Sequence, residues 1–147
     1  MPEIVTPDAF RPIVNGHFRV PKKSKDVSFM GLVGSIAHWL FVRGDVVSIT
    51  VSAATDLVPQ SNSDIADCLW SDICIALDLG DCLMGEHRIV KEKRATFAQT
   101  PEQLLKRSGA KTQWKNLALA GDWTATGLPA TIEGTIRSGN TAASFVF

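Results

Sequence analysis

The most regular alternation of apolar and polar residues lies in residues 32–52, which are rich in valine, isoleucine, phenylalanine and tryptophan. Val47, Ile49 and Val51 alternate with serine and threonine, so they predict a strand that buries one face. Gly44 lies between two such stretches and supplies the positive φ that a tight turn needs, next to an aspartate that tolerates turn geometry. The pattern predicts a β-hairpin of two long strands.

A second pattern repeats every four residues and predicts a helix over residues 63–79, with an apolar face formed by Ile65, Leu69, Ile73 and Leu77. Ser61 has the spacing of a capping residue relative to the aspartate three positions later, and Gly80 suits the end of the helix. Cys68 and Cys74 fall inside the predicted helix, where we expect them to be small buried residues.

The rest of the chain completes a mixed order of strands and helices. Residues 12–20 and 86–97 predict two further strands, and residues 102–113 predict a polar, basic connection. Residues 116–121 predict a short buried strand, followed by a turn and a helix from about residue 129 to the end of the chain. This order of elements predicts an α+β, or mixed α/β, fold.

Composition and charge narrow the possible functions. The chain has 15 basic and 15 acidic residues, so its net charge of zero argues against a nucleic-acid-binding protein. The short run that contains Lys22, Lys23 and Lys25 is typical of a solvated loop. The three histidines are far apart and lack the spacing of metal ligands, so we predict no metal site.

Three cysteines without a CxxC pair predict free thiols, and therefore a reducing compartment such as the cytoplasm. The first residues lack the pattern of a signal peptide, and no stretch approaches the roughly 20 apolar residues that span a bilayer. We therefore expect a cytoplasmic protein that is at most peripheral at a membrane surface.

The most informative motif lies near the C-terminus. The expected strand ends at Gly121, which allows another group to approach the backbone closely, and Asp122 follows at the carboxyl end of the strand. The loop then enters the predicted helix through Pro129, a residue suited to a first helical turn. The amides at this helix start, those of Ala130, Thr131 and Ile132, would favour an anion or an electron-rich carbonyl. An ordinary strand, turn and helix, with the aspartate as a cap, explains the same residues.

The stretch Leu119-Ala-Gly-Asp-Trp-Thr, followed by Gly127-Leu-Pro-Ala-Thr-Ile-Glu-Gly and Arg137-Ser-Gly, resembles the C-terminal flavin motif of the amine oxidase and phytoene desaturase superfamily. The resemblance implies an FAD cofactor. It implies that Asp122 binds the ribityl or pyrophosphate region, and that the amides of Thr131 and Ile132 meet the pyrimidine carbonyl of the flavin. The other implied cofactor residues belong to the same motif: Gly121, Gly127, Glu133 and Gly134. Trp123 and Leu128 would face the flavin or the substrate, with structural packing as an equal alternative.

Four segments carry a finer resemblance, to the hydroxysqualene dehydroxylases: residues 12–15, 39–45, 51–53 and 91–101. It implies a terpenoid substrate and the reductive loss of the hydroxyl group of hydroxysqualene, which gives squalene for hopanoid biosynthesis. The alternatives are a carotenoid or phytoene desaturase, another amine-oxidase-like flavoprotein, and a non-catalytic remnant domain. Apolar walls of a substrate cavity could come from Ile36, Leu40, Phe41 and Val47, although core packing explains these residues too. No catalytic acid or base is assigned.

The G-x-G-x-x-G turn with which the superfamily binds the FAD pyrophosphate has no counterpart in this sequence. We therefore expect residues 1–100 to be part of a substrate-binding domain, and residues 101–147 to be the C-terminal segment of an FAD-binding domain. The chain alone should bind FAD weakly or not at all. Besides the lipid substrate, its expected partners are an N-terminal nucleotide-binding part or a second copy of itself.

Overall fold

The structure, a computed structural model, describes residues 4–21 and 28–145. The chain divides into two compact units: Arg11–Ala95, here called the sheet unit, and Met1–Phe10 with Thr96–Phe147, here called the helical unit. The basic run with Lys22, Lys23 and Lys25 lies outside the described residues. The assignment of residues 1–100 to substrate binding and of residues 101–147 to flavin binding stays a prediction.

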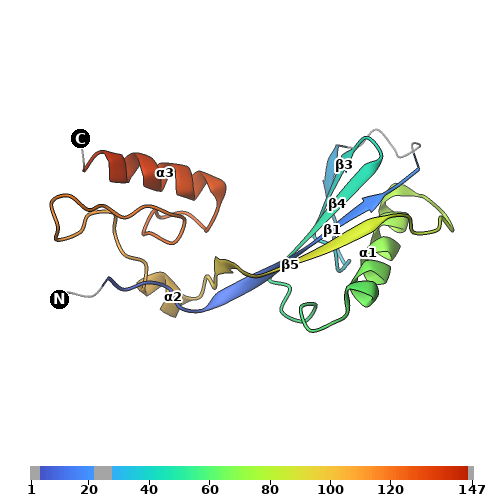
Figure 1. Ribbon diagram of the computed structural model, residues 1–147, viewed down its shortest axis with the longest axis horizontal. Coiled ribbons are helices and arrows are strands. Elements are labelled where there is room, and N and C mark those ends of the chain that lie inside the picture. Colours follow the sequence, from blue (N-terminus) through green and yellow to red (C-terminus); the bar gives the residue numbers. More distant parts are fainter. Residues whose placement is uncertain (1–3, 22–27, 146–147) are drawn as a thin grey trace. The chain divides into compact units, whose positions relative to one another are not determined.

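Five strands form one sheet in the order β2-β3-β4-β1-β5, which confirms the predicted α+β fold (Figure 1). The strands are β1 (Phe10–Arg19), β2 (Phe29–Gly31), β3 (Trp39–Arg43), β4 (Val46–Ser52) and β5 (His87–Phe97). The pairs β1–β4, β2–β3 and β3–β4 are antiparallel. The predicted hairpin is β3–β4, with Gly44 at a φ of 63° in its turn. Its first strand is shorter than predicted, because residues 32–38 are irregular and β3 begins only at Trp39.

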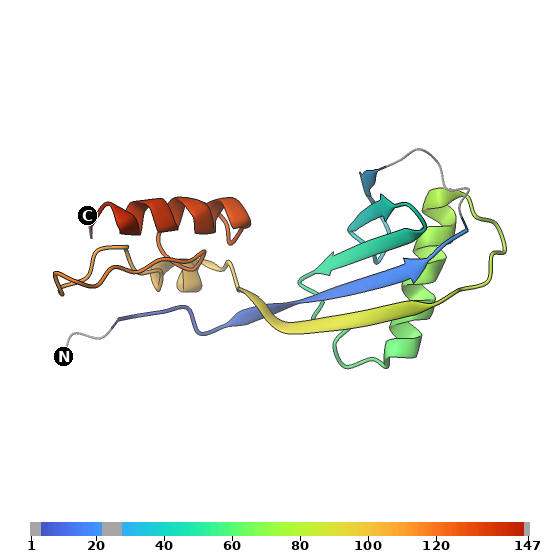
Figure 2. The ribbon, with the colours of Figure 1, turned by 45° about the horizontal axis from the view of Figure 1, so that its top comes forward.

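One face of this sheet is covered by helix α1 (Asn62–Leu77), as Figure 2 shows. The predicted inward residues of β4 are buried against it, with Val47 and Ile49 fully inaccessible. The helix contributes the predicted apolar face, including Leu69 and Ile73. Burying one such aliphatic side chain contributes about 1.5–3 kcal/mol to folding. This layer therefore forms the main core of the sheet unit.

Both ends of α1 are fixed by local contacts. The hydroxyl of Ser61 accepts a hydrogen bond of 3.0 Å from the amide of Asp64, which confirms the predicted cap. The helix ends before Gly80, because Asp78 takes the left-handed conformation with a φ of 56°, which a short polar side chain tolerates. Cys68 and Cys74 lie on the helix as predicted, but they are half-buried and not fully buried.

The helical unit holds α2 (Pro101–Leu105) and α3 (Ile132–Ala143). The short α2 lies in a stretch that was predicted to be an irregular polar connection. The predicted strand at residues 116–121 is wrong: this stretch forms only an isolated bridge between Lys111 and Ala118. A strand needs a neighbouring ladder, and the described residues provide one paired position there.

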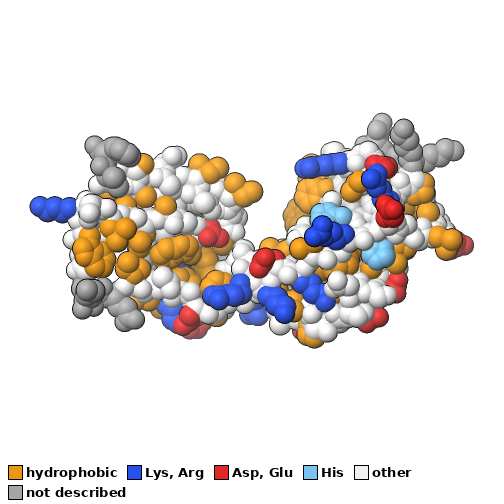
Figure 3. Space-filling model, in the orientation of Figure 1, with side chains coloured by type: hydrophobic (Ala, Val, Ile, Leu, Met, Phe, Trp, Pro, Cys, Tyr) orange, Lys and Arg blue, Asp and Glu red, His pale blue; other side chains and the backbone are white. Residues whose placement is uncertain are grey.

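The helical unit buries few apolar side chains among its described residues, namely Pro7, Phe97, Ala98 and Ala142. Its large hydrophobic side chains with substantial exposure are Ile4, Val5, Leu104, Leu105, Trp114, Leu117, Ile132, Ile136 and Phe145. Hydrophobic side chains gather on the surface of this unit in Figure 3. Across the described residues, no helix combines the length and the apolar character needed to cross a membrane.

Candidate functional site

The predicted site residues cluster in the loop of residues 121–128 and at the start of α3. Gly121 begins this loop with a φ of 140°, a conformation that residues with a side chain rarely adopt. A Cβ at Gly121 would also lie 2.6 Å from Nε1 of Trp123, because the indole packs directly against this backbone. Glycine is therefore required here both by the backbone conformation and by the packing of Trp123, which is half-buried.

A ring of hydrogen bonds attaches the beginning of the loop to α3. The amide of Gly121 donates to Oγ of Ser138 at 2.8 Å, and the hydroxyl of Thr124 donates to the carbonyl of Gly121 at 2.8 Å. The two hydroxyls lie 2.8 Å apart. Because Thr124 uses its proton on Gly121, the hydroxyl of Ser138 is the donor between them. Both side chains are 2% exposed, so the ring satisfies polar groups that are out of reach of water.

The rest of the loop wraps around one side chain, that of Arg107, which sequence patterns did not single out. Its guanidinium donates to four acceptors of the loop: the carbonyls of Asp122 at 3.0 Å, Trp123 at 3.4 Å and Leu128 at 2.9 Å, and Oγ1 of Thr126 at 3.0 Å. Its central carbon also lies 5.2 Å from the centroid of the Phe97 ring, a cation–π distance. A lone arginine in a polar stretch has no sequence signal, because its partners lie 15 to 21 residues away along the chain.

Helix α3 starts later than predicted. Thr131 is its N-cap, because the side chain of Thr131 accepts a hydrogen bond of 3.1 Å from the amide of Gly134. Ala130 and Thr131 therefore precede the helix, and the amides at its first positions are those of Ile132 and Glu133. Within the described part of the chain these two amides donate to no protein acceptor. They are available to a ligand with an oxygen atom or a negative charge.

Two residues of the first turn have close neighbours in the chain itself. A Cβ at Gly134 would lie 2.9 Å from the carbonyl oxygen of Pro129. Glycine at this position therefore allows the backbone of Pro129 to approach the first turn of α3. Glu133 forms an exposed ion pair of 2.6 Å with Arg137, one turn along. Such a pair stabilises a helix by about 0.3–0.5 kcal/mol, and the carboxylate also suits the positive end of the helix dipole. The structure therefore gives Glu133 a contact within α3.

The carboxylate of Asp122 is the free acidic group of the loop. Its backbone carbonyl is held by Arg107, yet no described residue donates a hydrogen bond to its side chain, which is half-buried. Gly127, with a φ of 74°, has no atom within 4 Å of where a Cβ would stand. A free carboxylate, two free amides and an open glycine fit a ligand that carries hydroxyl groups and a carbonyl. Among the described residues, no three His, Cys, Asp or Glu side chains gather as metal ligands.

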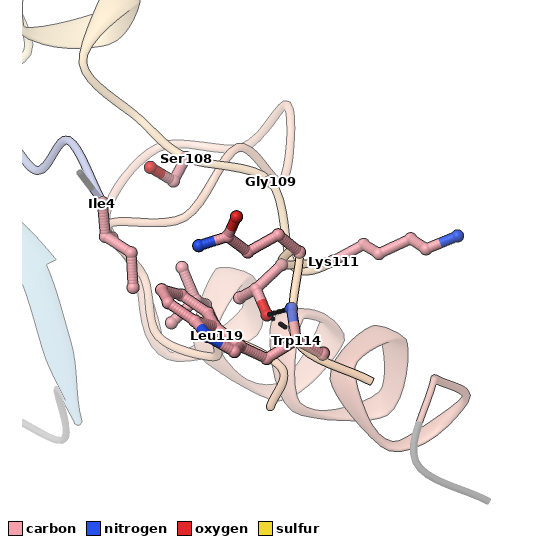
Figure 4. A pocket seen from close by; sticks show the side chains of 8 residues that line it. Ile4, Ser108, Gly109, Lys111, Trp114 and Leu119 are labelled. Carbon is pink, nitrogen blue, oxygen red and sulfur yellow. Dashed lines mark hydrogen bonds between the residues drawn. The ribbon is translucent and has the colours of Figure 1, made fainter. Parts of the chain in front are cut away.

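A cavity of about 260 Å³ lies in the same unit, between Ile4 and residues 108–119 (Figure 4). Its lining includes the ring of Trp114 and the side chains of Ile4 and Leu119, while Lys111 points away from it. The amide of Trp114 donates a hydrogen bond of 3.1 Å to the hydroxyl of Thr112, which fixes this part of the cavity wall. The lining also includes the polar residues Ser108, Thr112 and Gln113, so the cavity offers hydrogen-bonding groups beside its apolar surface.

Comparison with known proteins connects this geometry to a family. Residues 12–146 match the family described as flavin containing amine oxidoreductase. The chain is similar to hydroxysqualene dehydroxylases from Rhodopseudomonas palustris (44% identity over 99% of the chain), Sinorhizobium fredii (45% over 97%) and Zymomonas mobilis (43% over 97%). The matches cover 35%, 34% and 34% of these proteins, so the chain spans about a third of the length of the curated relatives that it matches.

Proposed function

The chain belongs to the family of flavin containing amine oxidoreductases, and on this basis we propose that loop 121–128 and the start of α3 form one wall of an FAD site. One observation carries the proposal: the carboxylate of Asp122 and the amides of Ile132 and Glu133 form no hydrogen bond with any described residue of the chain. FAD offers hydroxyl groups that a carboxylate can bind and carbonyl oxygens that helix amides can bind.

The roles follow from this chemistry. Asp122 would accept hydrogen bonds from the ribityl chain, or bind ordered water near the pyrophosphate. The amides of Ile132 and Glu133 would meet the pyrimidine carbonyl, with Thr131 fixing the helix start as its cap. Close approach of the cofactor would be allowed at Gly127, whose Cβ position is open, while Gly121 and Gly134 would shape the backbone of the site. Trp123 and Leu128 would present the loop's apolar surface to the flavin or the substrate.

We propose that the reaction is the reductive dehydroxylation of hydroxysqualene, because the three relatives are named hydroxysqualene dehydroxylase. The proposed product is squalene, and the proposed context is hopanoid biosynthesis. Reduced flavin would supply the hydride that replaces the hydroxyl group, which leaves with one proton as water. The chain's own contribution is to bind, to orient and to exclude water. The helix start would stabilise negative charge on the pyrimidine ring.

The sheet unit would contribute apolar surface for the terpenoid. Of the four residues that sequence patterns suggested, Leu40 and Val47 are fully buried in the core, so they do not line a cavity. Ile36 and Phe41 are 43% and 37% exposed, and the ring of Phe41 stacks on Phe29 at 6.3 Å between centroids.

The free thiols fit a cytoplasmic protein. A terpenoid substrate that partitions into lipid favours attachment at a membrane surface.

The test uses a hybrid protein in which this chain replaces the matching third of the Rhodopseudomonas palustris relative, because the chain alone is expected to bind FAD weakly. The hybrid receives either hydroxysqualene with a flavin reductant or phytoene with an oxidant, and the lipids are extracted and analysed. We expect squalene from the first mixture and no product from the second. Conversion of phytoene with hydroxysqualene unchanged would replace this proposal with a desaturase.

The same hybrid tests the role of the loop. Asp122→Ala should raise the dissociation constant for FAD about ten- to 100-fold, since a hydrogen bond to a charged group contributes roughly 1.5–3 kcal/mol. The control is Asp67→Ala, which removes an exposed carboxylate from α1 in the sheet unit. Equal flavin retention in the two variants would remove Asp122 from the site.

A further inference from the structure

We propose that Arg107 is the positioning residue of the flavin-contacting loop: its guanidinium holds both ends of residues 121–128 in the arrangement that the cofactor meets. The inference rests on the proposed function and adds to it a residue outside the flavin motif. Four of the five N–H groups of the Arg107 side chain donate hydrogen bonds to this loop.

The contacts join the two ends of the loop. Asp122 and Trp123 lie at its beginning and Leu128 at its end, and the carbonyls of all three are bound by the same planar group. A carbonyl fixed in direction fixes the plane of its peptide, and with it the direction in which the neighbouring side chain leaves the backbone. The position of the Asp122 carboxylate and the approach to α3 therefore depend on Arg107.

Nothing else in the described chain replaces these bonds. The carbonyls of Asp122 and Trp123 accept from Arg107 alone, and the carbonyl of Leu128 has one other donor, the hydroxyl of Thr126, at 3.5 Å. The loop has no helix or strand of its own to hold it. Without Arg107, these half-buried carbonyls would turn toward water, and the loop would leave its present shape.

The guanidinium is itself held in place. Phe97, the last residue of β5, is 3% exposed and provides a fixed surface under the arginine at 5.2 Å. The planar fork matches acceptors that converge from several directions. A lysine ammonium has three donors on one atom and cannot reach acceptors spread over both ends of the loop. The geometry therefore selects arginine and not simply a positive charge.

The Thr124–Ser138 ring provides a way to separate positioning from folding. This ring binds the beginning of the loop to α3 without using Arg107. The amide of Ala125 also donates to the carbonyl of Ser108 at 2.9 Å. The loop should therefore stay attached when Arg107 is replaced, while residues 126–128 lose their fixed course. We expect a local change in the loop and in flavin binding, with the sheet unit unaffected.

The test compares Arg107→Lys and Arg107→Met with Arg43→Met, which removes an exposed arginine from β3. In the 147-residue chain, hydrogen exchange should be at least tenfold faster at the amides of Thr126 and Leu128, which are bonded within the loop, in both Arg107 variants, with β3 and β4 unchanged. In the hybrid protein, both variants should raise the dissociation constant for FAD at least tenfold. At saturating FAD, the visible circular dichroism of the bound flavin should also differ from that of the parent protein.

The Arg43→Met variant should match the parent protein in all three measurements. Normal flavin dichroism and affinity in Arg107→Met, in a hybrid that binds FAD, would overturn the positioning role. A full return to parental values in Arg107→Lys would show that charge alone suffices and would overturn the fork argument. If the unsubstituted hybrid bound no FAD, the proposed function would fail, whereas the exchange rates of the loop would still decide whether Arg107 positions it.

Discussion

Two glycines of α3 have different surroundings, although they lie five positions apart in one helix. A Cβ at Gly134 would meet the backbone oxygen of Pro129 at 2.9 Å, whereas a Cβ at Gly139 would meet no atom within 4 Å. Gly134 is buried and Gly139 is exposed. The glycine at residue 134 therefore serves the close turn before the helix, and the glycine at residue 139 makes no such contact.

Alanine substitutions at these two positions should have opposite signs. Gly139→Ala should raise the free energy of unfolding by about 0.5–1 kcal/mol, because alanine loses less backbone freedom in a helix. Gly134→Ala gains the same helical preference, but the backbone of Pro129 cannot move aside cheaply, so we expect a net loss of about 1–3 kcal/mol. Thermal or urea unfolding of α3, followed by circular dichroism, measures both. A stabilised Gly134→Ala variant would show that this turn can relax.

At the scale of elements, α2 is attached to the N-terminal segment by a polar cluster. The side chain of Gln103 accepts hydrogen bonds from the amides of Asp8 and Ala9 and donates one of 2.7 Å to the Asp8 carboxylate. Lys106 adds an ion pair of 2.7 Å with the same carboxylate. The bonds from Lys106 and Gln103 lower the pKa of Asp8 from its ordinary value of 3.8.

This lowered pKa predicts how the attachment depends on pH. A carboxylate with a lowered pKa in the folded state contributes stability above its ordinary pKa and loses it as the pH falls through the folded value. The segment at Asp8 should therefore stay attached to α2 at neutral pH and detach only in acid below about pH 3.8. Chemical shifts of the Asp8 and Ala9 amides, followed by NMR during an acid titration, measure this.

The matched variant for this titration is Asp8→Asn, which keeps an acceptor for Gln103 and removes the charge that Lys106 binds. Its amide shifts at Ala9 should be flat over the same pH range. A titration in Asp8→Asn with the midpoint of the parent chain would mean that another group controls the attachment.

Elements with local signals were predictable, and those that depend on distant partners were not. The spacing of Ile65, Leu69 and Ile73 and the cap at Ser61 determine α1 within one stretch of sequence. The five-residue α2 is too short to show a period, so residues 102–113 were predicted to be a polar connection. The run at residues 116–121 has the composition of a strand, but a strand also needs a neighbour to pair with.

The candidate site shows the same division. The glycines and Asp122 stand next to each other in the sequence, so a motif could indicate them. The start of α3 was misplaced by about three residues, because Pro129 suits a first turn and Thr131 suits a cap equally well. Arg107 was missed, since nothing in its neighbourhood reveals four acceptors that fold around it.

At the scale of the whole molecule, the two units differ in the size of their cores. The sheet unit buries aliphatic and aromatic residues from β1, β3, β4 and α1 in one cluster, in which Phe18, Leu40 and Leu69 are 0–1% exposed. In the helical unit the buried apolar residues among those described are Pro7, Phe97, Ala98 and Ala142, and two of these are alanines. Since hydrophobic stabilisation scales roughly with buried apolar area, the sheet unit should be the more stable of the two.

Native-state hydrogen exchange at increasing urea tests this ranking. Amides of β4 and α1 should be the last to exchange, at the free energy of global unfolding, and amides of α3 should exchange by opening of the helical unit alone. Leu69→Ala should lower the protection of the sheet unit by about 2–5 kcal/mol, because it leaves a cavity under α1. In the hybrid protein, FAD should raise the protection of α3 in proportion to the logarithm of its concentration, because a ligand that binds only the folded unit stabilises that unit by mass action. Exchange of α3 and β4 at a single common free energy in the chain alone would mean that the two units unfold together and that the difference in core size has no consequence.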